Sequence, residues 1–165
     1  MKPRSNFQDY LDQCTFPSKG ELICAVSGGA DSAALLILAS ETSSTVKAIH
    51  VNHGLRKEVS EEAKKVETLA NKLNVDFEEI KIELVDGPNL EERGRDARYG
   101  VLPVEVLTGH TADDQAETIL IHLMRGGSLD ALSGMRPSGH PLLRLRRSDT
   151  EAICDRFGYQ PIFDP

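Results

Sequence analysis

A short glycine-containing loop between an expected strand and an expected helix constrains this chain more than any other feature. The loop, residues 27–32, reads Ser-Gly-Gly-Ala-Asp-Ser; it follows the apolar run 22–26 and leads into the helix-forming run 33–38. Such a loop places backbone N–H groups that lack intrahelical partners at a helix N-terminus, where the helix dipole favours an anion. The sequence therefore predicts a phosphate-binding site at the carboxyl end of a strand.

The side chains of this loop suit phosphate chemistry. Gly28 and Gly29 allow a sharp turn and a close approach of a ligand to the backbone, and the hydroxyls of Ser27 and Ser32 can donate to phosphate oxygens. Asp31 would repel a phosphate unless a hard cation such as Mg²⁺ lay between them, which makes it a candidate metal ligand. The alternative is a plain turn in which Asp31 and Ser32 only cap the following helix.

Composition narrows the class of protein. The 165 residues fit one ordinary domain, and 39% hydrophobic with 27% charged residues are globular proportions. No apolar run is long enough to span a bilayer and no signal-peptide core follows Met1, so we expect a cytoplasmic protein without membrane contact. Cys14, Cys24 and Cys154 are odd in number and widely spaced, which argues against a zinc site, an iron–sulfur site or a disulfide framework.

Charge is distributed unevenly along the chain. The formal net charge is −7, so the domain as a whole is not expected to attract nucleic acid. One expected helix nevertheless carries Arg93, Arg95 and Arg98, and a second basic cluster comprises Arg136, His140, Arg144, Arg146 and Arg147. Such clusters can contact phosphate groups; the alternative is that they form solvated faces or pair with nearby carboxylates.

Hydrophobic patterning predicts the α/β class. Strands are expected over residues 22–26, 45–51, 75–84 and 104–108, with the third at or near an edge and a possible further edge strand over 141–145. Helices are expected around 7–14, over 33–38, 60–73, 90–102 and 148–157, and from Ala112 onward, with Ser148 as the cap and Gly158 as the stop of the last one. We therefore expect a doubly wound parallel sheet of about five strands with helices on both faces, and a ligand beyond the carboxyl ends of the strands.

The helix that begins at Ala112 carries a second group of chemically interesting residues. Its apolar positions form a stripe of Ala116, Ile119, Leu120, Leu123 and Met124. Asp113, Asp114 and Glu117 lie near its N-terminus, directly after the strand end that bears His110. The helix dipole alone favours carboxylates in a first turn, but three of them beside a histidine exceed what capping needs. We therefore predict a second part of the site here.

Several segments of the sequence resemble those of a known protein family. The loop 27–32 resembles the Ser-Gly-Gly-x-Asp-Ser signature of the PP-loop ATP pyrophosphatases, which share the adenine nucleotide alpha hydrolase-like fold. Together with further segments it makes the chain similar to the catalytic N-terminal domain of the bacterial tRNA(Ile)-lysidine synthetases. The matching segments are 27–32, 50–56, 89–92, 97–99, 107–118, 123–127, 141–143 and 163–165. The family usually has a second histidine where this chain has Thr111.

This resemblance implies a two-step reaction on the wobble cytidine of an isoleucine tRNA with a CAU anticodon. ATP adenylates the 2-oxygen of the cytosine with loss of pyrophosphate, and the ε-amino group of free L-lysine then displaces AMP to give lysidine. It also implies that residues 1–165 form a single catalytic domain, and that the tRNA-binding domains that follow in relatives are absent from this sequence. No oligomeric state is predicted.

The resemblance further implies roles for individual residues. Mg²⁺ would be held by Asp31 and Asp114, Glu117 or His110 would accept a proton from lysine or orient its amine, and Arg98 would stabilise developing phosphate charge. The predicted ATP-binding residues are Ser27, Gly28, Gly29, Ala30, Asp31, Ser32, His50, Asn52 and His53.

Two other functions compete with this one. Another PP-loop enzyme would thiolate tRNA or amidate a small substrate, and thiolation normally needs paired cysteines, which the chain lacks. A nucleotide-binding module without catalysis would not need Asp31, Asp114 and Glu117 together beside phosphate.

Overall fold

The computed structural model describes residues 7–52, 59–82, 90–126 and 133–162. Its sheet consists of β1 (Leu22–Ala25), β2 (Val46–Asn52) and β3 (Asp76–Lys81), all parallel and in the order β1-β2-β3. The register places Cys24 opposite Ala48 and Ala48 opposite Phe77. On its other edge β1 pairs with Leu107 through a single bridge to Cys24, so β1 lies between β2 and the segment around Leu107.

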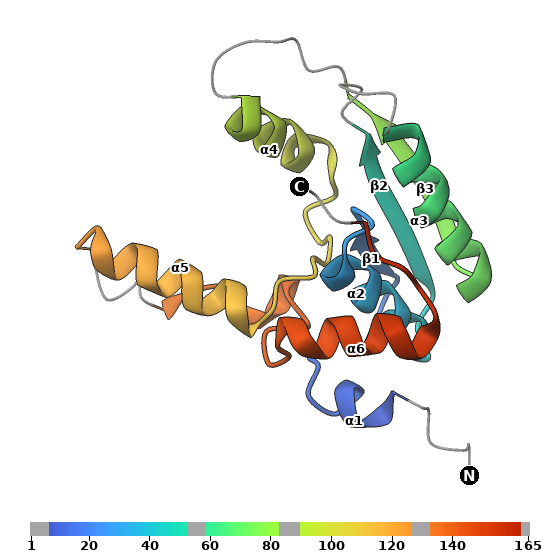
Figure 1. The fold of residues 1–165 in the computed structure, drawn as a ribbon, viewed down its shortest axis with the longest axis horizontal. Helices are drawn as coiled ribbons and strands as arrows, with labels where there is room; N and C mark the ends of the chain where they lie inside the picture. Colours follow the sequence, from blue (N-terminus) through green and yellow to red (C-terminus); the bar gives the residue numbers. More distant parts are fainter. Residues whose placement is uncertain (1–6, 53–58, 83–89, 127–132, 163–165) are drawn as a thin grey trace.

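Seven helical segments accompany this sheet in the described residues. They are α1 (Gln8–Leu11), α2 (Ala30–Ser40), α3 (Val59–Leu73), α4 (Leu90–Val101), α5 (Ala112–Met124), the 3-10 turn η2 (Pro137–Gly139) and α6 (Arg147–Phe157). The helix α2 packs against β1, α3 and α6, which makes it the centre of the fold. In Figure 1, α4 and α5 lie on the side of the molecule away from α3.

The hydrophobic core forms around α2 because that helix is apolar on all sides. Every residue from Ser32 to Ala39 is buried, as expected of a helix enclosed by other elements. The helix α3 is amphipathic instead, and it buries Ala63, Val66 and Ala70 on one face. Leu142, Leu145 and Ile153 complete the core from the C-terminal part of the chain.

The α/β class with a parallel sheet flanked by helices is confirmed, but the prediction of about five strands is wrong for the described residues. Residues 104–108 do not extend into a strand, because a turn follows Pro103, with Val106 N–H donating to its carbonyl at 3.1 Å, and Val104 is fully exposed. Only Leu107 bonds to β1, through Ile23 and Ala25. The expected edge strand over 141–145 is a run of turns that buries two leucines three residues apart.

The last helix begins one residue earlier than expected and is not capped by Ser148. Arg146 occupies the N-cap position, and the Asp149 carboxylate accepts a hydrogen bond of 2.7 Å from its backbone N–H. Asp149 lies at the third helical position, where a side chain can reach back to the cap residue. Gly158 ends the helix with a φ of 76°, as predicted for a glycine stop.

The apolar stripe predicted on α5 exists but is not buried in the described structure. Figure 1 shows α5 extending away from the sheet, and no residue of this helix is buried. Leu120, Leu123 and Met124 are each more than half exposed. Neither α5 nor any other helix in the described ranges is long and apolar enough to cross a membrane.

Candidate functional site

The loop between β1 and α2 is organised by the hydroxyl of Ser32. This hydroxyl accepts hydrogen bonds from the backbone N–H groups of Ser27 at 3.1 Å and Gly28 at 3.3 Å, and it donates to the carbonyl of Gly29 at 3.1 Å. Ser32 is therefore directed into the loop, while Ser27 is exposed. Gly29 is the N-cap of α2, so Ala30 and Asp31 open the helix and turn its positive end toward the loop.

Gly28 is fixed by the segment that follows α6. Its φ of 98° lies in the left-handed region, and a Cβ atom there would overlap the side chain of Ile162. Its carbonyl accepts two hydrogen bonds of 2.9 Å, one from the Tyr159 hydroxyl and one from the Ile162 backbone N–H. Residues far apart in the sequence thus hold the loop in one shape.

Gly109 brings the Leu107 segment against the start of α2. A Cβ atom on Gly109 would lie 2.6 Å from the backbone oxygen of Asp31 and 2.9 Å from the nitrogen of Ser32. Backbone atoms cannot move away as the end of a flexible side chain can, so this position requires glycine. The contact places the residues that follow Gly109 directly beside the loop.

We expect Gly109→Ala to lower the free energy of unfolding by about 1–3 kcal/mol, because the added methyl group overpacks a backbone contact. In a domain of this size each kcal/mol corresponds to about 2–4 °C in Tm, so thermal unfolding can measure it. The matched control is Gly100→Ala in α4, where a Cβ atom meets nothing within 4 Å. Gly100→Ala should be neutral or stabilising, and equal Tm values for the two variants would contradict the argument.

Asp31 lies in the first turn of α2 and contacts α6. Its carboxylate accepts a hydrogen bond from the Thr150 hydroxyl, and its Oδ2 atom lies 3.8 Å from Nε of Arg147. Burial raises the pKa of Asp31, and the nearby Asp114 and Glu151 add to the rise, while Thr150 and Arg147 oppose it. The charged form of a carboxylate with a raised pKa is stabilised when a further cation lies beside it.

Asp114 lies in the first turn of α5 and faces the same arginine. Its Oδ2 atom accepts hydrogen bonds from the backbone N–H and the hydroxyl of Thr111, at 2.7 and 2.8 Å, and its Oδ1 atom lies 3.5 Å from Nη2 of Arg147. Burial alone would raise the pKa of Asp114, but the two bonds from Thr111, with the charges of His110 and Arg147, outweigh burial and lower it. Thr111 is the N-cap residue of α5, and Asp114 therefore also completes its capping box.

The two carboxylates form a donor set that fits Mg²⁺. One guanidinium group, that of Arg147, contacts Asp31 and Asp114. Mg²⁺ usually takes one or two carboxylates, with phosphate and water oxygens completing its shell. No cluster of three or more metal-binding side chains occurs in the described residues, so a protein-only cage is not formed there.

His50 and Asn52 lie near the carboxyl end of β2, beside the loop 27–32. His50 is buried, its Nδ1 atom donates to the Val26 carbonyl at 2.8 Å, and its Nε2 atom has no hydrogen-bond partner among the described residues. A buried polar atom of this kind is costly unless something binds it. The Asn52 amide donates to Glu79 on β3 at 2.7 Å, and His53 lies outside the described residues.

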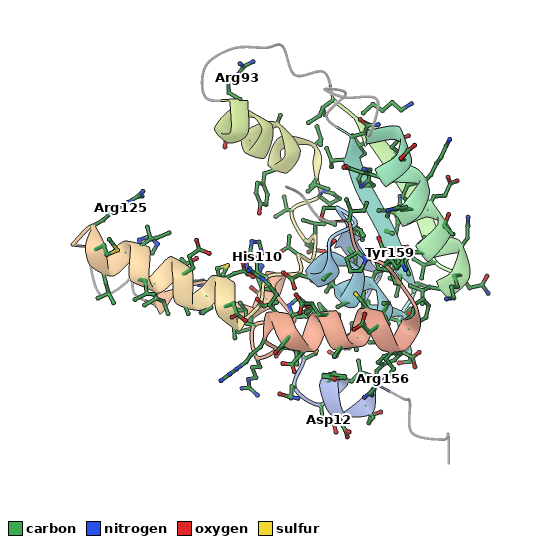
Figure 2. All side chains as sticks on the ribbon, viewed as in Figure 1. Asp12, Arg93, His110, Arg125, Arg156 and Tyr159 are labelled. Atoms are coloured by element: carbon green, nitrogen blue, oxygen red, sulfur yellow. The ribbon has the colours of Figure 1, made fainter. Side chains whose placement is uncertain are left out.

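His110 lies at the inner end of α5 in Figure 2 and belongs to a small polar cluster with Thr108 and His140. The Thr108 hydroxyl lies 2.7 Å from Nδ1 of His110 and 2.6 Å from Nδ1 of His140. The two rings meet edge to face with centroids 4.8 Å apart. Burial, followed by the charge of His110, lowers the pKa of His140.

For Glu117 and Arg98 the described structure gives the position on a helix but no contact with the rest of the site. Glu117 lies on α5 about one turn after Asp113 and Asp114 and is exposed. Arg98 lies on α4, but its side chain is outside the described part of the structure. The structure therefore brings Asp31, Asp114 and the loop 27–32 together and leaves the relation of Arg98 to them open.

Sequence reasoning missed the residues that link these pieces. Arg147 and His140 fall in the basic cluster of residues 136–147, which pointed to phosphate or carboxylate partners without naming which. The Arg147 backbone N–H also donates to Asp113 at 2.8 Å, so the start of α6 is bonded to the start of α5. Thr150 and Tyr159 carried no signal in the sequence, because their contacts to Asp31 and Gly28 span more than a hundred residues.

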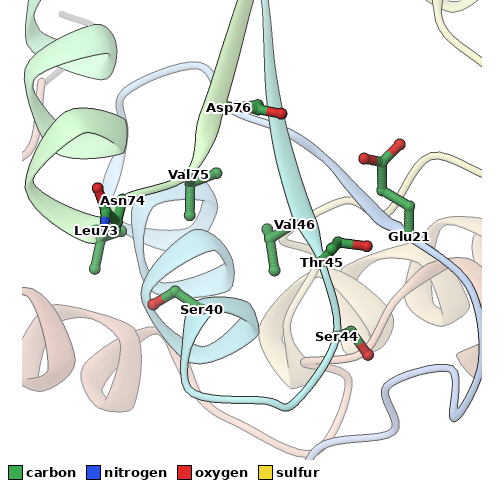
Figure 3. Close-up of a pocket in the computed structure, with 9 residues that line it drawn as sticks. All are labelled: Glu21, Ser40, Ser44, Thr45, Val46, Leu73, Asn74, Val75 and Asp76. Carbon is green, nitrogen blue, oxygen red and sulfur yellow. The ribbon is translucent and has the colours of Figure 1, made fainter.

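A hollow lies at the end of the sheet opposite the loop 27–32. It has a volume of about 330 Å³ and is lined by residues at the amino ends of β2 and β3 and at the ends of α2 and α3, including Ser40, Thr45, Asn74 and Asp76 (Figure 3). Ligands of doubly wound sheets bind beyond the carboxyl ends of strands. We therefore assign the candidate site to the loop 27–32 and not to this hollow.

The comparison with known families agrees with this geometry. A family model described as a PP-loop domain matches residues 3–165. The chain belongs to the PP-loop domain family. The match includes the loop, β1, α2, Asp114 and the segment after α6, which are the parts that the structure brings together.

Individual relatives and solved structures extend this result. The chain is 36% identical to a tRNA(Ile)-lysidine synthase of Novosphingobium aromaticivorans, over 88% of this chain and 51% of the relative. It is 37% identical to the tRNA(Ile)-lysidine synthase of Rhodococcus erythropolis, over 91% of this chain and 49% of the relative. The chain thus spans about half the length of these curated relatives.

Among solved structures, the U34-tRNA thiolase NcsA from Methanococcus maripaludis, with its [4Fe-4S] cluster, superposes with a TM-score of 0.73. That superposition covers 96% of this chain and 64% of the thiolase, at 15% sequence identity. At this identity the likeness supports the PP-loop family fold and no particular activity.

Proposed function

We propose that this chain carries the catalytic site of a tRNA(Ile)-lysidine synthetase, which uses ATP and Mg²⁺ to join L-lysine to the wobble cytidine of an isoleucine tRNA with a CAU anticodon. The observation that carries the proposal is that Asp31 and Asp114 both lie beside the guanidinium group of Arg147, next to the loop 27–32. The relatives named tRNA(Ile)-lysidine synthase support the choice of reaction.

The first step needs a triphosphate held still while an oxygen attacks its α-phosphorus. The 2-oxygen of cytosine forms a bond to the α-phosphorus, and the bond from that phosphorus to the bridging oxygen breaks, so pyrophosphate leaves with the electron pair. The N-terminus of α2 and the glycines of the loop suit the leaving pyrophosphate, because backbone N–H groups and the helix dipole stabilise its charge. Mg²⁺ on Asp31 and Asp114 would screen the phosphate oxygens.

We assign two further residues to the ATP site, one beside the loop and one on α4. His50 Nε2, buried and without a partner in the described structure, can accept a hydrogen bond from a ligand hydroxyl or amino group. Arg98 on α4 remains our candidate for the developing negative charge, a role that planar guanidinium groups suit.

The second step needs the ε-amino group of lysine in its neutral form. An ammonium group must lose a proton before its nitrogen can attack C2 of the adenylated cytosine, and the bond from C2 to the AMP oxygen then breaks with AMP keeping the electron pair. A positioned base typically contributes about 10²–10⁴-fold to such a step. We assign the proton transfer to His110 and the binding of the ammonium group to Glu117.

The cysteines do not favour the thiolation alternative. Cys14, Cys24 and Cys154 are all free thiols. Burial raises the pKa of each to about 12. The thiolate is the reactive form of cysteine, so these three positions do not suit sulfur transfer.

The proposed function is tested by ATP–pyrophosphate exchange together with incorporation of labelled lysine. We expect exchange to require tRNA(Ile) with a CAU anticodon, and lysine incorporation to follow it, since the cytosine oxygen is the acceptor of the adenylate. A tRNA(Ile) transcript with another base at the wobble position is the matched control. Exchange that proceeds equally well without tRNA would contradict the proposal and favour a small-molecule substrate.

A further inference from the structure

The geometry of the cluster formed by Thr108, His110 and His140 restricts which nitrogen of each histidine ring carries a proton. Thr108 directly follows the bridge at Leu107, and its backbone N–H donates to the Gly139 carbonyl at 3.0 Å. That bond holds the segment bearing His110 against the segment bearing His140. Both imidazoles then present Nδ1 to the same hydroxyl, at 2.7 and 2.6 Å.

A threonine hydroxyl has one proton and accepts with its lone pairs. It can therefore donate to only one of the two imidazoles and must accept from the other. Its remaining acceptor, the Gly139 carbonyl, lies 3.5 Å away, at the outer limit of a hydrogen bond. The ring that donates carries its proton on Nδ1, whereas the ring that accepts carries its proton on Nε2, so the two histidines hold opposite tautomers.

The surrounding charges decide which ring donates. The charges of His110 and of the Asp114 carboxylate interact, and this interaction lowers the pKa of Asp114. His140 is half-buried, and both burial and the charge of His110 lower its pKa. We therefore take His140, the half-buried ring, as the one that accepts the hydroxyl proton, and His110 as the one that donates from Nδ1.

We propose that Thr108 and His140 are positioning residues that hold His110 in its Nδ1–H tautomer, so that Nε2 of His110 is the nitrogen that takes and releases a proton. The hydrogen bonds run from His110 Nδ1–H to Thr108 Oγ1 and from Thr108 Oγ1–H to His140 Nδ1. A neutral imidazole that is held in one tautomer always presents the same unprotonated nitrogen to the substrate, as with other bases oriented by a neighbouring acceptor. The catalytic use of this arrangement rests on the proposed function; the tautomer itself does not.

The test is nuclear magnetic resonance of the chain labelled with ¹⁵N-histidine, at a pH where both rings are neutral. Long-range ¹H–¹⁵N correlation distinguishes a nitrogen that bears a proton from one that does not. We expect the His110 signals to show a protonated Nδ1 and a bare Nε2, and the His140 signals to show the reverse. Two neutral rings with the same tautomer, or His110 protonated on Nε2, would overturn the proposal.

Substitutions separate positioning from general structure. Thr108→Val removes the shared hydroxyl at nearly constant volume and should shift His110 to the Nε2–H form or a mixture. His140→Leu should shift His110 in the same direction, whereas His140→Asn keeps a polar atom near the Nδ1 position and should retain the wild-type tautomer. His122→Asn on α5 is the matched control and should leave the His110 signals unchanged. An unchanged His110 spectrum in Thr108→Val would contradict the proposal, and the wild-type spectrum decides the question if that variant does not fold.

A second measurement connects the tautomer to the reaction. Thr108→Val should reduce lysine incorporation about tenfold or more and leave ATP–pyrophosphate exchange near the wild-type rate, because only the lysine step needs the base. Absence of both activities in the wild-type chain would contradict the proposed function while the tautomer measurement still stood. Equal losses in both activities would overturn the assignment of the histidine pair to the lysine step.

Discussion

Replacing Asp31 with asparagine is expected to reduce Mg²⁺-dependent release of pyrophosphate by about a thousandfold, the size of effect seen when a group that stabilises transition-state charge is removed. The reason is the position of the Asp31 carboxylate, which lies in the first turn of the helix that follows the phosphate loop and faces Asp114 across Arg147. Asparagine keeps the shape of the side chain but loses the negative charge that Mg²⁺ requires. Asp31→Ala should have the same effect on turnover.

The fold of the Asp31→Asn variant should remain intact or gain stability. Burial raises the pKa of Asp31 above its usual range, so at neutral pH the charged form is less favourable in the folded chain than in the unfolded one. An amide oxygen can still accept the hydrogen bond from Thr150. We therefore expect an unchanged or higher Tm together with the loss of activity.

Asp155→Asn, at an exposed position on α6, is the matched control and should change neither quantity. Pyrophosphate release by Asp31→Asn at the wild-type rate and with the wild-type dependence on Mg²⁺ would show that Asp31 is not a metal ligand. A large fall in Tm would instead show that the charge of Asp31 stabilises the fold through Arg147.

The parts of this site that the sequence predicted are those that depend on neighbours along the chain. The apolar run of β1, the two glycines and the apolar helix α2 all lie within residues 22–40. Hydrophobic periodicity and helix-terminus rules use only such short windows. The order of β1, a glycine-containing turn and α2, and the α/β class, were accordingly predicted correctly, although α2 begins at Ala30 and not after Ser32.

The predictions that were wrong, and the residues that were missed, depend on tertiary contacts. Residues 104–108 have strand-like composition, yet the turn after Pro103 leaves only Leu107 bonded to β1. The contact between Thr150 and Asp31 joins positions 119 apart, and periodicity does not indicate a single pair at that separation. The polar links of Arg147, His140 and Tyr159 were missed for the same reason.

The helix α5 shows a different limit of sequence reasoning. Its apolar stripe was predicted from spacing, and the helix forms over Ala112–Met124. Spacing identifies the apolar face of a helix but contains no information on which element covers it. In the described structure Leu123 and Met124 are exposed at the end of α5, which Arg125 marks in Figure 2.

Glu117→Gln is expected to separate the two half-reactions, because only the second one uses an amine. Glu117 is an exposed carboxylate on α5, one turn after Asp113 and Asp114, which contact Arg147. A carboxylate attracts the ammonium form of lysine, whereas attack of the cytosine oxygen on ATP needs no such group. We expect lysine incorporation to fall about a hundredfold or more, while formation of adenylated tRNA continues.

Two alternatives give different results for the same variant. If Glu117 only interacts with the N-terminus of α5, Gln would cost a few tenths to about 1 kcal/mol of stability and would spare both steps. Glu67→Gln, at an exposed position on α3, is the matched control for the loss of one carboxylate and should change neither step. Adenylate formation and lysine incorporation are measured separately, with labelled ATP and labelled lysine. Equal loss of both would place Glu117 with Asp31 and Asp114 at the metal, and its assignment to lysine would then be wrong.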